Sequence, residues 1–244
     1  MNLFRQSLPA LFGLLVFSFS ASAQVNPLAT VSGFTGRSID ISAGDEARLL
    51  LYKGPEYYNY APTIANGHPF FLTGDFQTGR VVYENVLYEN VPLLYDIVQD
   101  ELILEHYDGF YKIQLNKADV SAFSMNGHSF IHLKTGNQGS TIPAGFYEVL
   151  YQGETSLYAR RTKSIRERNV QVQVVRDAKS SDQYFIQTAS GLLAIKNLKA
   201  ALKIMDSHAD AIRQHLKSRD LNYKRDPQQT LIEAVKYYDQ ISSK

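Results

Sequence analysis

Six histidines are the first residues to consider for chemistry, because an imidazole can bind a metal ion or act as a base. His128 and His132 have the i, i+4 spacing of a ligand pair on a helix. On a strand, four residues span roughly 13 Å, whereas two ligands of one zinc ion each lie about 2 Å from the metal. His208 and His215 lie seven residues apart, which is about 10 Å along a helix. We therefore expect neither pair to bind a metal ion, and no cofactor is predicted.

Motifs for nucleophilic catalysis and for nucleotide binding are missing from the sequence. The chain has no Gly-x-Ser-x-Gly segment, no cysteine and no glycine-rich phosphate loop. Three alternatives stay open: a metal site assembled from distant residues such as His68 and His106, a Ser–His triad without a motif, and two carboxylates at the spacing of a glycosidase. The sequence therefore favours a protein without catalytic residues over an enzyme.

An aromatic segment supplies the candidates for ligand binding. Tyr57, Tyr58 and Tyr60 are followed by His68 and Phe70. If they are exposed, these side chains form a platform for a sugar or a peptide. The favoured alternative is that the rings cover one end of a sheet, because aromatic side chains bury large areas in cores. Several rings exposed on one patch would indicate a site.

The segment 160–168 contains five basic residues and one acidic residue. It is interpreted either as a contact for anionic lipid or polysaccharide, or as a solvated strand end or linker. The second interpretation is favoured because the chain after residue 23 has equal numbers of basic and acidic residues. Such a balance gives no overall field to attract DNA or RNA, so nucleic acid is not an expected partner.

The N-terminus has the three-part pattern of a secretory signal peptide. One cation, Arg5, precedes an apolar run of 12 residues from Leu8 to Phe19, and small residues at Ala21 and Ala23 suit a signal peptidase. The run is shorter than the roughly 20 residues of a membrane span, so a permanent anchor is the less favoured alternative. We predict cleavage after Ala23, export to the periplasm or beyond, and no transmembrane segment in the mature chain. Since cysteine is absent, we also predict no lipid anchor.

The middle of the chain alternates apolar and polar residues between turn residues, a pattern typical of antiparallel hairpins. Asn126-Gly127 and Asp108-Gly109 suit tight turns because Asn, Asp and Gly accept a positive φ. The string Tyr83-Glu84-Asn85-Val86 recurs over 88–91, which is too short for a structural repeat. Residues 54–62, rich in proline and tyrosine, are expected to form a packed loop. The expected strands are 48–52, 79–84, 91–95, 101–105, 111–116, 120–125, 128–133, 146–151, 156–161, 183–187 and 192–195.

From Asn197 the apolar spacing changes to that of a helix. Leu198, Leu202 and Met205 share one face, and 209–219 repeats the pattern. Asp226-Pro227 predicts the start of a third helix, with Asp as N-cap and Pro at the first helical position. Three short amphipathic helices need to pack on one another or on the sheet.

Several strings of residues are typical of a protein group rather than of a catalytic site. They are Leu51-Tyr52-Lys53-Gly54, Gly67-His68-Pro69-Phe70, Val91-Pro92-Leu93-Leu94-Tyr95-Asp96, Gly145-Phe146-Tyr147-Glu148-Val149-Leu150-Tyr151 and Tyr237-Tyr238-Asp239. With these strings, most of the chain after the signal peptide resembles a group of uncharacterised exported envelope proteins of Bacteroidota. The resemblance implies export to the cell envelope and brings no activity and no site residue with it.

The combined prediction is an α+β protein. The chain begins with a signal peptide over 1–23 and continues with an irregular leader or late-added strand over 24–44. An antiparallel meander or open barrel then spans 45–195, and a helical subdomain spans 196–244. The expected function is non-catalytic binding of an envelope protein or a glycan. The alternatives are an envelope hydrolase with an unrecognised His or carboxylate site, and a lipid or lipoprotein carrier with an open concave apolar face.

Overall fold

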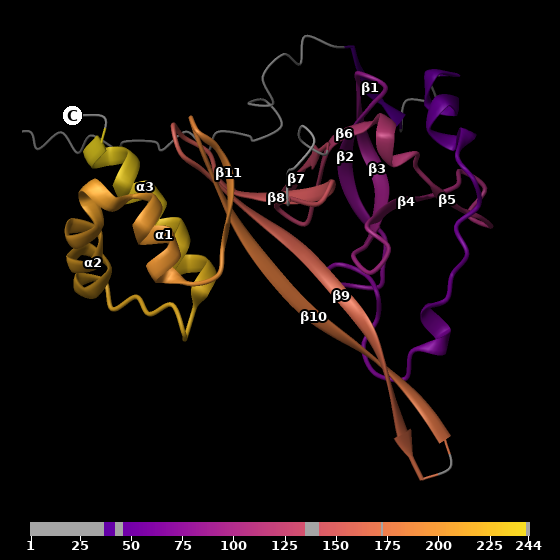
Figure 1. Cartoon of the computed structure of the whole chain (residues 1–244). Helices are drawn as coiled ribbons and strands as arrows, with labels where there is room; N and C mark the ends of the chain where they lie inside the picture. Colours follow the sequence, from indigo (N-terminus) through magenta and orange to yellow (C-terminus); the bar gives the residue numbers. More distant parts are fainter. Residues whose placement is uncertain (1–36, 42–45, 135–141, 172, 243–244) are drawn as a thin grey trace, which may run out of the picture.

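One twisted, open antiparallel sheet forms the body of the protein, and helices pack against one end of it (Figure 1). The structure, a computed structural model, describes residues 37–41, 46–134, 142–171 and 173–242. The predicted signal peptide and most of the predicted leader lie outside these residues. The strands are β1 (Ser38–Asp40), β2 (Gln77–Tyr83), β3 (Val86–Asp96), β4 (Glu101–Glu105), β5 (Lys112–Gln114), β6 (Val120–Met125), β7 (His128–Leu133), β8 (Gly145–Tyr151), β9 (Ser156–Val170), β10 (Gln173–Thr188) and β11 (Gly191–Ile195).

The sheet combines two series of hairpins. Its strands follow the order β11-β10-β9-β8-β7-β6-β2-β3-β4-β5, and all neighbours on this path are antiparallel. Pairing of β2 with β6 joins the series β2 to β5 to the series β6 to β11. β1, which lies in the predicted leader, pairs with β3 in parallel. The predicted α+β fold with an antiparallel sheet is confirmed, and β11 and β5 lie at opposite edges.

Residues with positive φ form the tight turns. Asn126 and Gly127, with φ of 51° and 75°, join β6 to β7, which confirms the predicted hairpin. Glu84 and Asn85, with φ of 49° and 61°, join β2 to β3. Two central residues with positive φ give a type I′ turn, whose twist matches that of the strands. In the second copy of the repeated string, Asn90 has φ 60° and lies at a bulge where β3 has one residue more than β2.

A cluster of aromatic rings fills the core on one face of the sheet. Phe123 stacks on Phe130 with ring centroids 4.7 Å apart, and the edges of Tyr95 and Phe146 meet Phe123 at 5.2 Å and 5.1 Å. All four side chains are buried. Each contributes hydrophobic area and the favourable edge-to-face geometry of aromatic pairs. The four rings therefore fill this part of the core.

The predicted first strand over 48–52 is wrong. Residues Glu46–Lys53 form a 3₁₀ helix, in which Leu51 is fully buried and Leu49 is exposed. The three consecutive leucines of this segment have no alternation, and a short apolar run does not distinguish helix from strand by its period.

The helices follow the predicted ranges: α1 (Leu198–Ile204), α2 (Ala209–Ser218) and α3 (Pro227–Ser242). Asp226 caps α3, since its Oδ1 accepts a hydrogen bond from the backbone N–H of Gln229 at 2.9 Å. The apolar faces of the helices pack with Leu157 of β9 and Ile186 of β10 in a second core. Among the described residues, no helix has the length and apolar character needed to cross a membrane.

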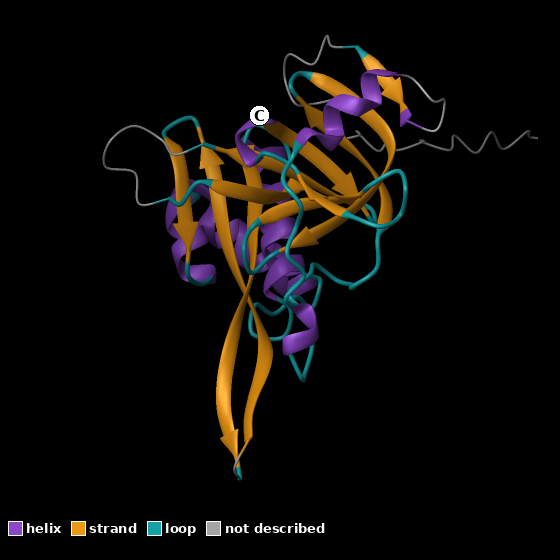
Figure 2. Ribbon diagram, turned by 90° about the vertical axis from the view of Figure 1, so that its right-hand side faces the viewer, coloured by secondary structure: helices purple, strands orange, loops and turns teal. Residues whose placement is uncertain are grey.

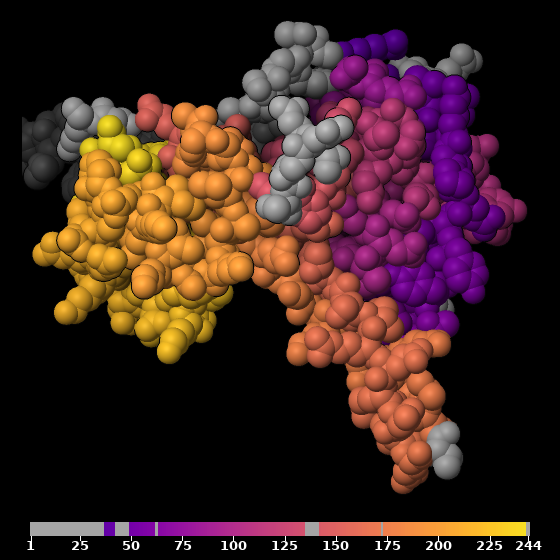
Figure 3. Space-filling view, in the orientation of Figure 1, coloured from indigo at the N-terminus to yellow at the C-terminus, as the bar shows by residue number. Residues whose placement is uncertain are grey.

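Strands β9 and β10 continue past the body as a two-stranded arm (Figures 2 and 3). The predicted strand 156–161 is therefore too short, because β9 runs to Val170 and contains the whole basic segment 160–168. Along the arm, short of the tip, β10 is flanked by a preceding loop, where the N–H of Ala65 donates to the carbonyl of Arg176 at 2.9 Å. Toward the tip both faces are exposed, including the side chains of Val170 and Val174.

Candidate functional sites

The structure brings four of the five residues predicted to bind a ligand together and leaves the fifth, Tyr58, exposed. Tyr57 and Phe70 are buried in one cluster, as expected for rings that cover the sheet. Tyr60 and His68 are partly buried, and His68 stacks on Phe70 with centroids 6.2 Å apart. Tyr58, in contrast, is 81% exposed. The five side chains therefore do not share one exposed platform.

A buried carboxylate holds two of these tyrosines in place. Oδ2 of Asp96 accepts hydrogen bonds from the hydroxyls of Tyr57 at 2.7 Å and Tyr60 at 2.8 Å. Its Oδ1 accepts from the backbone N–H of Val98 at 2.8 Å and of Gln99 at 3.0 Å. Burial, together with the hydrogen bond to Asp96, raises the pKa of both tyrosines far above the ordinary value for a phenol. These hydroxyls are thus structural donors.

Tyr58 lines a groove together with a ring from another part of the chain. We call the aromatic groove the space of about 450 Å³ lined by Tyr57 and by Glu56, Tyr58, Asn59, Phe110 and Lys112. Phe110, at the tip of the β4–β5 hairpin, is 86% exposed. Single exposed apolar residues are common, but two exposed rings on one groove indicate an interaction site.

Hydrogen bonds position both walls of the aromatic groove. On one wall, the N–H of Tyr57 donates to the carbonyl of Lys112 at 2.7 Å, which holds the tyrosine segment against β5. On the other wall, Oδ1 of Asp108 accepts from the N–H of Phe110 at 2.9 Å, and Gly109 has φ 73°. The predicted turn at Asp108-Gly109 is confirmed, as part of a longer loop between β4 and β5. Sequence reasoning missed Phe110 because a ring within a turn has no periodic signal.

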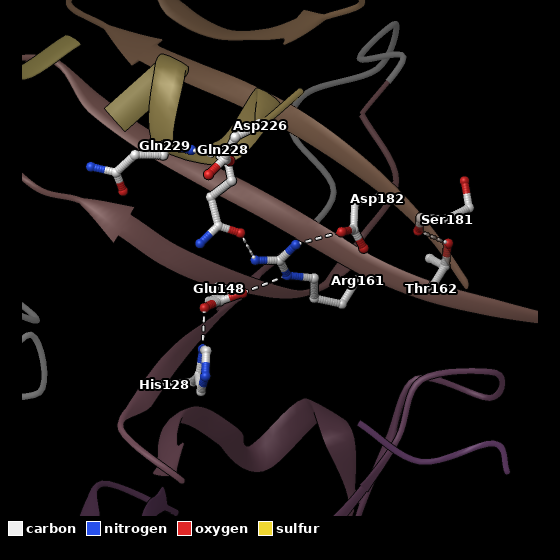
Figure 4. A network of polar contacts seen from close by, with 9 residues as sticks. All are labelled: His128, Glu148, Arg161, Thr162, Ser181, Asp182, Asp226, Gln228 and Gln229. Carbon is white, nitrogen blue, oxygen red and sulfur yellow. Dashed lines mark hydrogen bonds and ion pairs between the residues drawn. The ribbon is translucent and has the colours of Figure 1, made fainter. Parts of the chain in front are cut away.

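A second candidate site is a polar cluster at the root of the arm, formed by His128, Glu148, Arg161, Asp182 and Gln228 (Figure 4). Oε1 of Glu148 lies 2.5 Å from Nδ1 of His128, and Oε2 lies 2.5 Å from Nε of Arg161. The remaining guanidinium nitrogens contact Asp182 at 2.6 Å and Gln228 at 2.5 Å. The cluster thereby connects β7, β8, β9, β10 and α3.

The charge state of Glu148 determines how the cluster behaves. Burial opposes ionisation of Glu148, but hydrogen bonding to His128 and the charge of Arg161 together lower its pKa below the ordinary value. An ionised carboxylate only accepts hydrogen bonds, so Nδ1 of His128 carries the proton. His128 lines a cavity of about 400 Å³ that Ser180 and Lys163 also line.

The described residues contain no group of three or more His, Asp or Glu side chains arranged to hold a metal ion. His128 and His132 lie on β7, which confirms the predicted strand for this pair. His132 packs on Phe146 with centroids 5.2 Å apart, while His128 faces Glu148.

Comparisons of the chain with protein-family models, with curated proteins and with solved structures give no match.

Proposed function

We propose that this protein is a non-catalytic binding protein of a bacterial cell envelope and that its aromatic groove holds a glycan. One observation carries the proposed ligand class: Tyr58 and Phe110, 81% and 86% exposed, line the same groove. The signal-peptide pattern of residues 1–23 and the resemblance to exported proteins of Bacteroidota support the proposed compartment.

The chemistry of the aromatic groove suits a sugar. The C–H faces of a pyranose ring are apolar and stack on aromatic faces, and burying the two rings removes apolar area from water. The hydroxyls of the sugar need polar partners, which Glu56, Asn59 and Lys112 supply around the rings. Apolar walls with a few polar groups are the usual composition of a small-molecule site.

Calorimetric titration of the purified, processed protein with chitohexaose, cellohexaose and an oligogalacturonate tests the proposed ligand. We expect saturable binding of at least one of them, with affinity reduced at least tenfold in Tyr58→Ala and in Phe110→Ala. Leu49→Ala, which removes an exposed apolar side chain outside the groove, is the matched control and should bind like the wild type. Absence of binding to all three, or binding that neither ring affects, would contradict the proposal.

The proposed compartment has its own test. The protein produced in a Gram-negative bacterium is fractionated, and its intact mass is measured. We expect recovery in the periplasm or medium, with Gln24 as the first residue. A full-length protein in the cytoplasm would contradict export without affecting the glycan proposal.

A hydrolase is the second candidate function, and the polar cluster favours it. His128 is oriented by Glu148, and Ser180 lines the same cavity, so a base and a hydroxyl face a common space. Hydrolysis of p-nitrophenyl esters or glycosides that is lost in both His128→Ala and Ser180→Ala would support this function. Hydrolysis unchanged in these variants, or no hydrolysis at all, would count against it.

A further inference from the structure

A second groove lies at the other edge of the sheet, beside β11. We call it the β11 groove. It has a volume of about 830 Å³, and its apolar wall consists of Leu193 and Ala194 of β11, Ala200 and Ile204 of α1, and Tyr238 of α3. Leu193 is 42% exposed in this groove, although its partner across the sheet, Ile186, is fully buried. Apolar area therefore faces solvent at the point where the sheet ends.

The edge of β11 away from β10 is not paired with another strand of the described residues. β11 pairs with β10 over all five of its residues and is the last strand of the sheet. Among the described residues, no backbone hydrogen bond joins its outer edge to another segment. An edge of this kind offers a row of N–H and C=O groups to an incoming strand.

The wall formed by β11 and α1 is basic. The chain from 183 to 205 contains Lys196, Lys199 and Lys203 and no acidic residue. Lys203 lines the β11 groove, and none of the three lysines forms an ion pair with a described residue. Among the described residues, Glu154, in the turn before β9, is the one acidic side chain that lines the groove. Lys203 and Glu154 balance inside the groove, and Lys196 and Lys199 beside it leave a net positive charge next to the edge strand.

We propose that the β11 groove binds an extended acidic peptide of a partner protein, which adds to the sheet as a strand beside β11. The main chain of the peptide would pair with the edge, an apolar side chain would enter the groove against Leu193, and a carboxylate would face Lys203. A lipid tail would fill the apolar space but would leave the backbone of β11 unpaired. The site lies at the edge opposite the aromatic groove, so the two proposals are independent (Figure 1).

The test uses the processed protein and a fluorescein-labelled ten-residue peptide in which Glu and Val alternate. We expect saturable binding by fluorescence anisotropy, and slower amide exchange in β11 when the peptide is bound. Leu193→Asp and the pair Lys199→Glu with Lys203→Glu should each weaken binding at least tenfold. Lys236→Glu, an exposed lysine of α3 that does not line the groove, is the matched control and should bind like the wild type. Both binding variants change exposed side chains, and circular dichroism of each confirms its fold.

Three results would overturn the proposal. The first is no saturable binding of this peptide. The second is equal binding of a peptide in which Lys replaces Glu. The third is a concentration-dependent dimer of the protein alone in which β11 is already protected from exchange, because the occupant of the edge would then be a second copy of the chain.

Discussion

Nε of Arg161 lies 2.5 Å from Oε2 of Glu148 at the point where the arm leaves the body, and Glu148 is buried while Arg161 is largely buried. Glu148 belongs to β8 and Arg161 to β9, and the guanidinium extends the contact to β10 and α3 through Asp182 and Gln228. A buried charge pair adds little net stability compared with apolar residues, but loss of one partner leaves a charge without compensation. The cluster therefore fixes the arm and α3 in one arrangement.

Glu148→Gln should destabilise the protein by about 3 kcal/mol, because it leaves the largely buried Arg161 with Asp182 alone as a counter-charge. Urea denaturation at pH 7 measures the change. Glu167→Gln is the matched control: Glu167 forms an ion pair with Arg176 on the exposed arm, and its loss should cost less than about 1 kcal/mol. Equal effects of the two substitutions would contradict the role assigned to the buried pair.

The same residue predicts a pH dependence. The pKa of Glu148 is lower in the folded protein than its ordinary value of 4.5, so the unfolded chain binds the proton more readily. The stability that this group contributes is complete above pH 4.5 and is lost as the pH falls through the lower folded-state pKa. Between pH 7 and pH 3, Glu148→Gln should therefore lose less stability than the wild type. Parallel losses in both proteins would show that Glu148 does not titrate as described.

Asp96→Asn should cost about 2 kcal/mol, because an amide has one oxygen where the carboxylate uses two as acceptors. One side receives the hydroxyls of Tyr57 and Tyr60 and the other receives two backbone N–H groups. An –NH₂ group therefore either meets the two N–H donors or forces the two hydroxyls to accept in place of donating. Tyr60→Phe removes one of these hydrogen bonds and should cost about 1 kcal/mol. Thermal unfolding measures both variants, and an effect of Tyr60→Phe as large as that of Asp96→Asn would contradict this account.

The sequence predicts an element correctly where the residue types at its ends favour a turn or a cap and the spacing of its apolar residues fits the same strand or helix. The turn at Asn126-Gly127 and the cap at Asp226 follow from residue types that favour these conformations. The two copies of the string at 83–86 and 88–91 show the limit. Both copies place an asparagine in the left-handed region, yet Asn85 lies in a turn and Asn90 lies at a bulge. The pairing of β3 with β2, and not the string itself, decides whether a turn or a bulge forms.

The candidate sites depend on contacts that the sequence does not encode locally. Tyr58 was predicted, but its partner in the aromatic groove, Phe110, belongs to a distant hairpin. Glu148 and Arg161 lie 13 positions apart on neighbouring strands. The pairing of β8 with β9 contains a register shift, so counting residues back from the turn does not predict which residues of the two strands lie opposite each other. Strand order and register, which depend on the whole core, therefore decide the sites.

Asp239→Ala should release the end of α3 from the sheet. Both carboxylate oxygens of Asp239 lie 3.1 Å from the backbone N of Thr155, so the substitution leaves a buried N–H unpaired at a cost of about 2 kcal/mol. Hydrogen exchange should become faster in the last turns of α3 and in the turn before β9. Asp226→Ala, at the start of α3, is the control and should affect the first turn alone, at about 1 kcal/mol. Uniform acceleration in both variants would show that α3 unfolds as one unit.

The tip of the arm should contribute almost nothing to stability. Val170 and Val174 are exposed, and beyond the flanking loop the two strands pair only with each other in the part of the chain that the structure describes. An isolated two-stranded ribbon is marginally stable, so Val170→Ser with Val174→Ser should change the free energy of unfolding by no more than about 0.5 kcal/mol. Leu157→Ala, in the buried part of the same strand, should cost about 2–5 kcal/mol. Urea denaturation compares the two, and a cost above 1 kcal/mol at the tip would mean that the arm packs against the body in solution.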